Sequence, residues 1–356
     1  GFVAALADLD GGRLQTAVMT LLHEGASAGV HCVISGDRSL TNYRMSSVTE
    51  DKLVLRMADR ADYTSAGLVP RTLPDVLPDG RGFQPEGGVE VQVAVLDGPV
   101  TGQGQAAALA AIGAAATARD VTVPRSRRPF RIDVLPASLT YAAAADFGGA
   151  GRPPLWALAG VGGDDLDARG PDLGRTPVFL VAGPAKSGRS TVLTTMGRWL
   201  LDAGVPLVVV APRPSPVREL PGLRGLLTGE VLTADELGPL LEPDGPMVLL
   251  VDDAELHKDT KAGELLKAYL RTAADRGRGL VVGGTTTDLA AGYSGWHAEA
   301  RKGRAGALLC PQGLADGELI GVRLPRSLVG EPVKAGRAHL HLGDGALVTV
   351  SVPRAD

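Results

Sequence analysis

Residues 178–200 read VFLVAGPAKSGRSTVLTTMGRWL, and this stretch decides the fold of the domain that contains it. An apolar run breaks into a glycine-rich turn, and the turn leads into a helical pattern that ends at Gly204. A buried strand, a loop of this kind and a helix are the parts of a phosphate-binding P-loop, where backbone N–H groups and the helix dipole hold a phosphate. The stretch therefore predicts a nucleotide site.

The loop GPAKSGRS has the spacing of a P-loop, with one unusual residue. Gly183 and Gly188 permit the tight backbone path, and Ser190 is placed to bind Mg²⁺. Arg189 stands where such loops carry lysine; it keeps the charge but prefers bidentate contacts. The alternative is a glycine-rich strand–helix turn without a nucleotide. The residues expected to bind phosphate are Gly183, Pro184, Ala185, Lys186, Ser187, Gly188, Arg189, Ser190 and Thr191.

A second element with the chemistry of nucleotide hydrolysis follows at MVLLVDDAE, where a buried strand ends in two acids. We expect Asp252 to hold the metal with Ser190, and Asp253 to orient the attacking water. Asp253 is one methylene shorter than the glutamate usual at this point, so this residue and Arg189 together predict slow hydrolysis. The alternative is that both acids simply end a strand at the surface.

Three further side chains are weaker candidates. Thr285 follows the strand GLVVGG, where a polar residue can contact the terminal phosphate, although a threonine there is also typical of a simple turn or cap. Arg301 and Arg304 are candidates for arginine fingers that act on a neighbouring subunit of an oligomer, or else are ordinary surface residues.

The order of elements around these motifs predicts the fold class. Apolar strands alternate with helical patterns, which indicates an α/β domain with a mainly parallel sheet and helices on both faces. Hydrophobic residues make up 44% and charged residues 21% of the chain, as in ordinary globular proteins, and the net charge of −4 does not indicate a nucleic-acid partner. The apolar runs are too short to cross a bilayer.

Two distant segments, 66–96 and 320–352, resemble each other. Pro70-Arg71 matches Pro325-Arg326, and Gly80-Arg81 matches Gly336-Arg337, at a separation far longer than that of a solenoid repeat. Upstream, HEGASAGVHCVISG (residues 23–36) matches TAADRGRGLVVGG (residues 272–284), which predicts an apolar strand in each. The expected domains are therefore the C-terminal part of an ATPase domain without its P-loop half (1–120), a joining linker (121–165) and one complete ATPase domain (166–356).

Together these residues resemble the FtsK/SpoIIIE family of P-loop ATPases, and most of all the C-terminal tandem ATPase domains of EccC-like type VII secretion proteins. The resemblance rests on the P-loop, on VLLVDD, on GLVVGGTT and on the repeated ending GRAHLHLGDGALVTVSV. It implies a RecA-like fold, ATP or ADP with Mg²⁺ as cofactors, and a cytoplasmic position tethered to the membrane through other parts of a longer polypeptide.

The resemblance also implies partners and a function. The expected partners are neighbouring ATPase domains of the same polypeptide, a secreted substrate peptide or helical hairpin protein, and further copies in an oligomer such as a hexamer. The leading hypothesis is a degenerate ATPase module that holds nucleotide, hydrolyses it slowly and regulates secretion or recognises its substrate. The alternatives are a DNA-translocating motor of the FtsK type, which would bind DNA, and a nucleotide-free scaffold.

Overall fold

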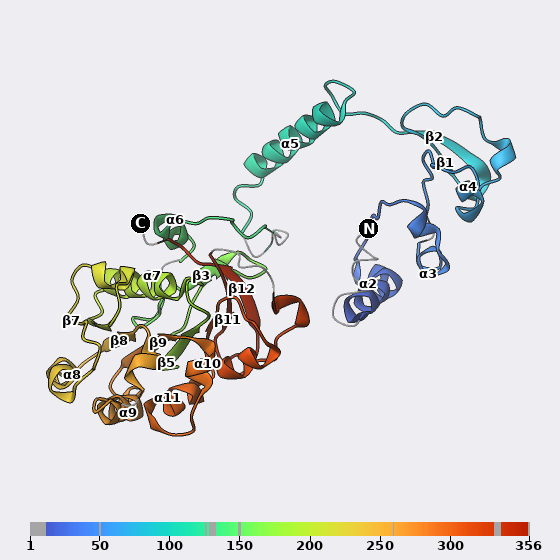
Figure 1. The fold of residues 1–356 in the computed structure, drawn as a ribbon. Coiled ribbons are helices and arrows are strands. Elements are labelled where there is room, and N and C mark those ends of the chain that lie inside the picture. Colours follow the sequence, from blue (N-terminus) through green and yellow to red (C-terminus); the bar gives the residue numbers. More distant parts are fainter. Residues whose placement is uncertain are drawn as a thin grey trace. The chain divides into compact units, whose positions relative to one another are not determined.

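Two compact units make up the chain, Gly1–Arg128 and Pro129–Asp356 (Figure 1). The computed structural model describes residues 12–49, 51–124, 127, 133–148, 151–258, 260–330 and 336–354. The division between the units lies inside the segment 121–165, which the sequence predicts to join two domains. No helix among the described residues is long and apolar enough to cross a membrane.

The second unit is built on one ten-stranded sheet. In sheet order its strands are β4 (Asp167–Arg169), β3 (Gly160–Gly162), β12 (Leu347–Ser351), β11 (Arg337–His341), β10 (Gly306–Leu308), β5 (Val178–Ala182), β9 (Arg278–Gly284), β8 (Met247–Val251), β6 (Leu207–Val210) and β7 (Gly225–Leu227). The strands from β10 to β7 are parallel to one another, whereas β4, β3, β12, β11 and β10 pair antiparallel. The predicted α/β fold with its parallel sheet is confirmed.

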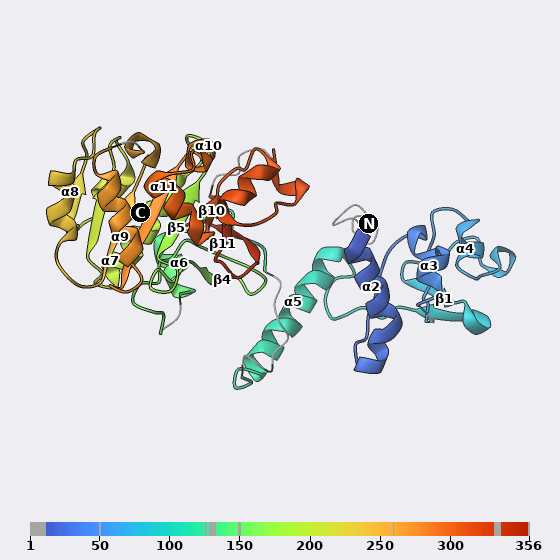
Figure 2. The same cartoon turned by 90° about the horizontal axis from the view of Figure 1, so that it is seen from below.

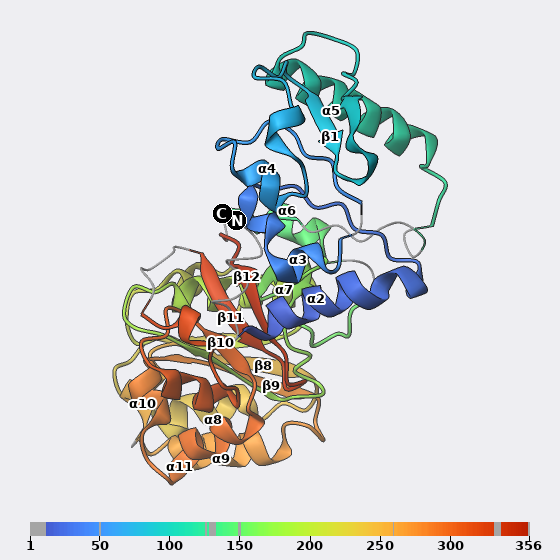
Figure 3. The same cartoon turned by 90° about the vertical axis from the view of Figure 1, so that its right-hand side faces the viewer.

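Helices cover both faces of this sheet, as Figure 1 and Figure 3 show, and Figure 2 gives the view from below. One face carries α7 (Arg189–Asp202) and the 3₁₀ helix η7 (Pro216–Glu219). The opposite face carries α8 (Ala234–Leu241), α9 (Gly263–Thr272), α10 (Thr286–Ala290) and α11 (Gly295–Ala300). The remaining helices of the unit are α6 (Tyr141–Asp146), η8 (Ala254–His257), η9 (Arg301–Gly303), η10 (Leu314–Ile320) and η11 (Arg326–Leu328).

The central strands β5, β6 and β8 are apolar along their whole length, as expected for strands that are buried on both faces. In β5, Phe179 and Val181 pack in the core on the α7 side, whereas Leu180 and Ala182 pack on the opposite side. This alternation is the two-residue period of a strand between two helix layers. Four fully buried apolar side chains of α7 follow the helical period and complete the first core: Val192, Leu193, Met196 and Leu200.

Part of the predicted linker 121–165 belongs to the second unit. It contains α6 and β3, and β3 extends the sheet by pairing with β12. The buried side chains of Tyr141, Trp156 and Leu158 form a small core against which Trp199 of α7 packs. The sequence of this segment has weak periodicity and many small residues. Its strand β3 therefore depends on the pairing with β12, which lies far along the chain.

The first unit is smaller and has a modest core. Its elements are α2 (Arg13–Glu24), η2 (Gly25–Ala28), η3 (Arg38–Thr41), α3 (Tyr43–Ser46), α4 (Asp62–Ser65), η4 (Pro70–Thr72), β1 (Arg81–Gln84), η5 (Glu86–Gly88), β2 (Val89–Gln92) and α5 (Gly102–Arg119). Its core consists of Val54, Tyr63, Ala66, Leu68, Leu73, Leu77 and Phe83. The helix α5 has no buried residue.

The repeated sequence has a repeated backbone geometry. Gly80 and Gly336 precede antiparallel hairpins, β1–β2 and β11–β12, with φ angles of 78° and 71°. In the first hairpin the Val93 N–H donates to the Gly80 carbonyl at 2.9 Å, and in the second the Val352 N–H donates to the Gly336 carbonyl at 2.9 Å. The two copies therefore share the local structure of this hairpin.

The strand predicted within residues 23–36 does not form. Residues 30–36 have no regular structure, and Val33 is fully exposed. Its counterpart in the second unit, β9, is hydrogen-bonded to a strand on each side. In the part of the first unit that the structure describes, no strand pairs with residues 30–36, and an apolar segment without such a partner leaves its backbone groups unpaired.

The packing of α7 gives a direct test of the fold. Leu193 is fully buried against the sheet, so Leu193→Ala should lower the free energy of unfolding by about 2–5 kcal/mol. Leu314→Ala provides the control, because Leu314 is 47% exposed and its loss should change stability by roughly 0.5 kcal/mol or less. Urea denaturation measures both. Equal stability of the two variants would contradict the placement of α7.

Candidate functional site

The P-loop and the acidic strand end meet at one edge of the sheet. Strand β9 lies between β5 and β8, and all three are parallel, so their carboxyl ends lie side by side. The Gly183 N–H donates to the Gly284 carbonyl at 3.3 Å, which joins the start of the loop to the end of β9. The residues that the sequence placed in one site are thus brought together.

The loop backbone depends on its two glycines. A Cβ at Gly183 would lie 2.6 Å from Ser187 Oγ and 2.7 Å from the Leu309 carbonyl oxygen, so no side chain fits there. Gly188 has a φ of 103°, a left-handed conformation that glycine adopts without strain, and it is the N-cap residue directly before α7. The first N–H groups of α7 have no acceptor within the helix, so they are available to an anion.

Arg189 crosses the site between the loop and the acidic strand end. Its Nη1 donates to the Gly183 carbonyl at 3.1 Å, and its Nη2 donates to Asp253 Oδ1 at 3.0 Å. The side chains of this ion pair are only 9% and 12% exposed. Arg213 Nη1 lies 3.9 Å from the same oxygen of Asp253. The guanidinium is therefore held at two points before any ligand binds.

Asp252 has a separate set of partners. Its Oδ2 accepts hydrogen bonds from Ser190 Oγ and Ser215 Oγ, both at 2.7 Å, and its Oδ1 accepts from the Asp253 N–H at 3.1 Å. Ser190 and Asp252, the two predicted metal ligands, are thus in contact. Ser215 was not predicted; the only signal for it is that it follows β6, the strand next to β8.

These residues fit a magnesium ion that is shared with a phosphate. Among the described residues, no group of three or more His, Cys, Asp or Glu side chains is arranged to hold a metal ion. Magnesium, however, usually takes one or two protein ligands, keeps several waters and completes its shell with phosphate oxygens. Ser190 and Asp252 would supply the protein ligands of such an ion.

Glu255 is a third acid at this edge that the sequence analysis missed. Its Oε2 is buried without a hydrogen-bond partner and lies against Gly284, 2.9 Å from where a Cβ would be. Burial raises the pKa of this carboxyl; the positive charge of Arg189 acts in the opposite direction, and the negative charge of Asp253 adds to the increase. Glu255 lies in the 3₁₀ helix η8, and its place directly after the two acids, in the sequence DDAE, could have indicated it as a site residue.

The weaker candidates make local contacts. Thr285 caps α10: its Oγ1 accepts from the Asp288 N–H at 3.1 Å and donates to Asp288 Oδ2 at 2.5 Å. The Arg301 guanidinium donates to backbone carbonyls in the last turn of α10 and directly after it, including that of Leu289 at 3.0 Å. Arg304 is exposed, with a φ of 46°. A role of these side chains in nucleotide binding stays a prediction.

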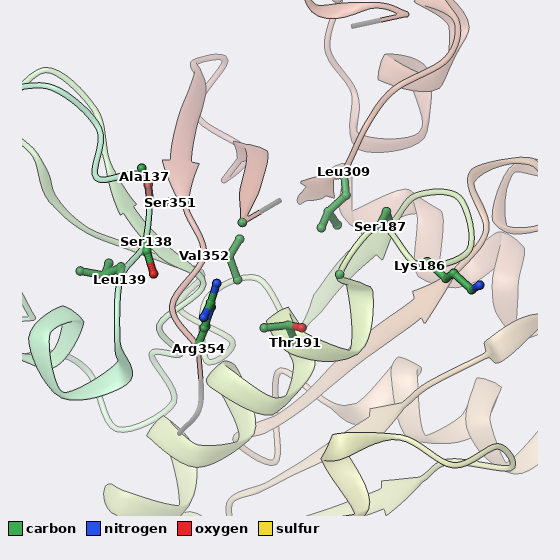
Figure 4. A pocket seen from close by; sticks show the side chains of 12 residues that line it. Ala137, Ser138, Leu139, Lys186, Ser187, Thr191, Leu309, Ser351, Val352 and Arg354 are labelled. Carbon is green, nitrogen blue, oxygen red and sulfur yellow. The ribbon is translucent and has the colours of Figure 1, made fainter. Parts of the chain in front are cut away.

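A pocket of ≈ 250 Å³ lies beside the loop (Figure 4). It is lined by Ala137, Ser138, Leu139, Lys186, Ser187, Gly188, Thr191, Leu309, Gly336, Ser351, Val352 and Arg354. The Arg354 N–H donates to the Leu139 carbonyl at 2.9 Å, so the segment before α6 pairs with the end of the chain and forms one wall. Ser187 Oγ is buried without a hydrogen-bond partner, whereas the Lys186 side chain points away from Arg354 in Figure 4.

Solved structures with a similar fold include pairs of ATPase domains. No protein-family model and no curated protein matches this sequence. The second and third ATPase domains of EssC from Geobacillus thermodenitrificans superpose with a TM-score of 0.64 at 14% identity, over 99% of this chain and 70% of that one. The same domains of Thermomonospora curvata EccC, in complex with a signal sequence peptide, give 0.57 at 19% identity, over 100% and 67%.

The cytoplasmic domain of EssC gives a TM-score of 0.58 at 13% identity, over 99% of this chain and 73% of that one. At such identities the likeness establishes the fold. It confirms the predicted RecA-like fold and the expected similarity to the ATPase domains of EccC-like type VII secretion proteins.

The raised pKa of Glu255 predicts how stability depends on pH. An acid whose pKa is higher in the folded state contributes stability when protonated, and that contribution is lost as the pH rises through the folded pKa. Glu255→Gln should therefore raise Tm near pH 8 by about 2 °C or more, and the gain should vanish towards about pH 4, where both side chains are neutral.

Glu299→Gln is the matched control, because the hydrogen bond from Lys302 lowers the pKa of the Glu299 carboxyl. This second variant should not gain stability near pH 8. Thermal unfolding across the pH range measures both effects. An increase in the Tm of Glu255→Gln that is independent of pH would contradict the raised pKa of Glu255.

Proposed function

We propose that the second unit binds ATP or ADP at residues 183–191, with Mg²⁺ on Ser190 and Asp252. The observation that carries the proposal is the 2.7 Å hydrogen bond between Ser190 Oγ and Asp252 Oδ2, which joins the P-loop to the acidic strand end. A glycine-rich strand–helix turn without a ligand would not need a buried carboxylate, 2% exposed, against the first turn of its helix.

The loop offers what a phosphate chain needs. The first N–H groups of α7 supply donors, the unpartnered Ser187 hydroxyl adds another, and the absence of a side chain at Gly183 leaves the loop free to curl. The pocket beside Thr191 would then receive the nucleoside, because it begins directly next to the loop and is lined by apolar groups such as Leu309 and Val352.

Hydrolysis at this site should be slow. In P-loop ATPases a lysine reaches the β- and γ-phosphate oxygens, and a nearby side chain positions the attacking water. Here Arg189 and Asp253, the residues at these two positions, are hydrogen-bonded to each other. Each would have to leave its partner before acting on a triphosphate, so the site favours holding a nucleotide over turning it over.

We further propose a regulatory or substrate-recognising role in a membrane-associated secretion ATPase, at the cytoplasmic face. The shared fold with EccC and EssC supports this, and one of those EccC structures contains a signal sequence peptide. The hairpin that both units share supports the proposal that the first unit is the C-terminal part of another ATPase-like domain, which precedes the ATPase domain of the second unit. Neighbouring ATPase domains, a secreted peptide and further copies of the chain are the proposed partners.

Nucleotide binding is tested at Gly183. Gly183→Ala would push a Cβ into Ser187 Oγ and the Leu309 carbonyl, so it should weaken ATP and ADP binding by at least about tenfold, measured by calorimetric titration with Mg²⁺. Gly238→Ala in α8 is the control, because the nearest atom to its Cβ would be Leu265 Cδ1 at 4.0 Å. Undiminished affinity in a folded Gly183→Ala protein would rule out this loop as the phosphate site.

Turnover is tested by restoring the residues usual in active P-loop ATPases. The double variant Arg189→Lys/Asp253→Glu exchanges the bridging guanidinium for a point charge and lengthens the acid, so single-turnover ATP hydrolysis should become faster by at least about tenfold. Measured rates that are equal in the double variant and the parent would mean that another step limits hydrolysis.

A further inference from the structure

The Arg189–Asp253 ion pair lies where the terminal phosphate of a nucleoside triphosphate would have to fit. We propose that this pair makes the site selective for nucleoside diphosphates over triphosphates. The inference rests on the proposed nucleotide binding and adds the ligand that the site prefers.

The position of the pair follows from the roles of its two residues. The side chain at the Arg189 position reaches β- and γ-phosphate oxygens, and the acid at the Asp253 position faces the water that attacks the γ-phosphate. A γ-phosphate therefore lies between these two side chains. In this protein Arg189 Nη2 and Asp253 Oδ1 are 3.0 Å apart, a hydrogen-bond distance that leaves no space for a phosphate between them.

Opening this pair is unfavourable because it is buried. Separating two buried charges leaves each without its partner, which destabilises a protein more strongly than the loss of an exposed pair. Arg189 is also held by its 3.1 Å hydrogen bond to the Gly183 carbonyl, which restricts how far the guanidinium can move away from Asp253. The second cation near Asp253, Arg213, is 59% exposed and 3.9 Å away, so it replaces Arg189 poorly.

The charges around the pair disfavour a third phosphate further. A γ-phosphate could take Asp253's place beside Arg189, but it would then face the released carboxylate of Asp253 and the carboxyl of Glu255, whose buried Oε2 has no hydrogen-bond partner. The Glu255 carboxyl interacts electrostatically with both Arg189 and Asp253. Like charges brought together in a partly buried site repel each other strongly.

A diphosphate meets neither obstacle. The groups that would hold its β-phosphate are the N–H groups at the start of α7, the Ser187 hydroxyl, and a metal on Ser190 and Asp252. None of these groups is part of the bridge from Gly183 through Arg189 to Asp253. The loop can therefore bind a diphosphate while the ion pair stays closed.

The test is calorimetric titration of the whole chain with ADP and with ATP, each in the presence of Mg²⁺. The parent protein should bind ADP at least about tenfold more tightly than ATP. Asp253→Asn removes the charge that holds Arg189 and keeps the shape of the side chain, so the preference for ADP should fall to about threefold or less.

Two further variants protect the test from a folding defect. Arg189→Lys has a single ammonium group, which cannot donate to Gly183 and Asp253 in the same planar geometry, so it should reduce the preference in the same direction. Asp244→Asn is the matched control, because the Asp244 side chain is 92% exposed and forms a surface ion pair with Arg276 at 3.7 Å. It should leave the preference unchanged. Thermal unfolding of every variant identifies those that fold.

The outcomes separate the two proposals. ATP binding as tight as ADP binding in the parent protein would overturn the diphosphate preference and leave the proposed function standing. A preference that persists in a folded Asp253→Asn or Arg189→Lys protein would overturn the role of the ion pair. If neither nucleotide binds, both proposals fail.

Discussion

The hydrogen bonding of β9 to β5 on one side and to β8 on the other sets the positions of the P-loop and of the acidic strand end. Because the three strands are parallel, the loop after β5 and the acids after β8 reach the same edge, with the end of β9 between them. This spacing lets the long side chain of Arg189 reach Asp253, and it brings Ser190 into contact with Asp252. The pairing of the buried apolar strands thus determines where Arg189, Asp252 and Asp253 lie.

The site contains two connected networks with different chemistry. Ser190, Asp252 and Ser215 form a compact hydroxyl–carboxylate cluster that suits a hydrated metal ion. Arg189 and Asp253 form a buried ion pair that extends from the loop to the strand end. The two networks meet through the Asp253 N–H, which donates to Asp252. A lysine at position 189 has a single ammonium group and could not bridge the Gly183 carbonyl and Asp253 as the planar guanidinium does. The arginine therefore connects the loop to the acidic strand end.

The two copies of the repeat separate local from long-range causes of structure. Gly80 and Gly336 have similar φ angles, and the hairpins that follow them are closed by equivalent hydrogen bonds. This local structure repeats because the turn residues and the two strands lie close together in the chain. The segments 30–36 and β9 are also similar in sequence, but only β9 is a strand, and it has a partner on each side. A strand in the middle of a sheet depends on residues far away along the chain.

Residue spacing and the common edge of parallel strands were enough to predict the P-loop, the acidic strand end, the alternation of strands and helices, and Ser190 and Asp252 as candidate ligands of one metal ion. The sequence did not predict that α6 and β3 join the core of the second unit, which depends on pairing with β12 at the far end of the chain. Nor did it predict Ser215, Glu255 or the Arg189–Asp253 bridge. Only the tertiary structure decided those contacts, because the direction of a long side chain depends on which partners the fold brings within its reach.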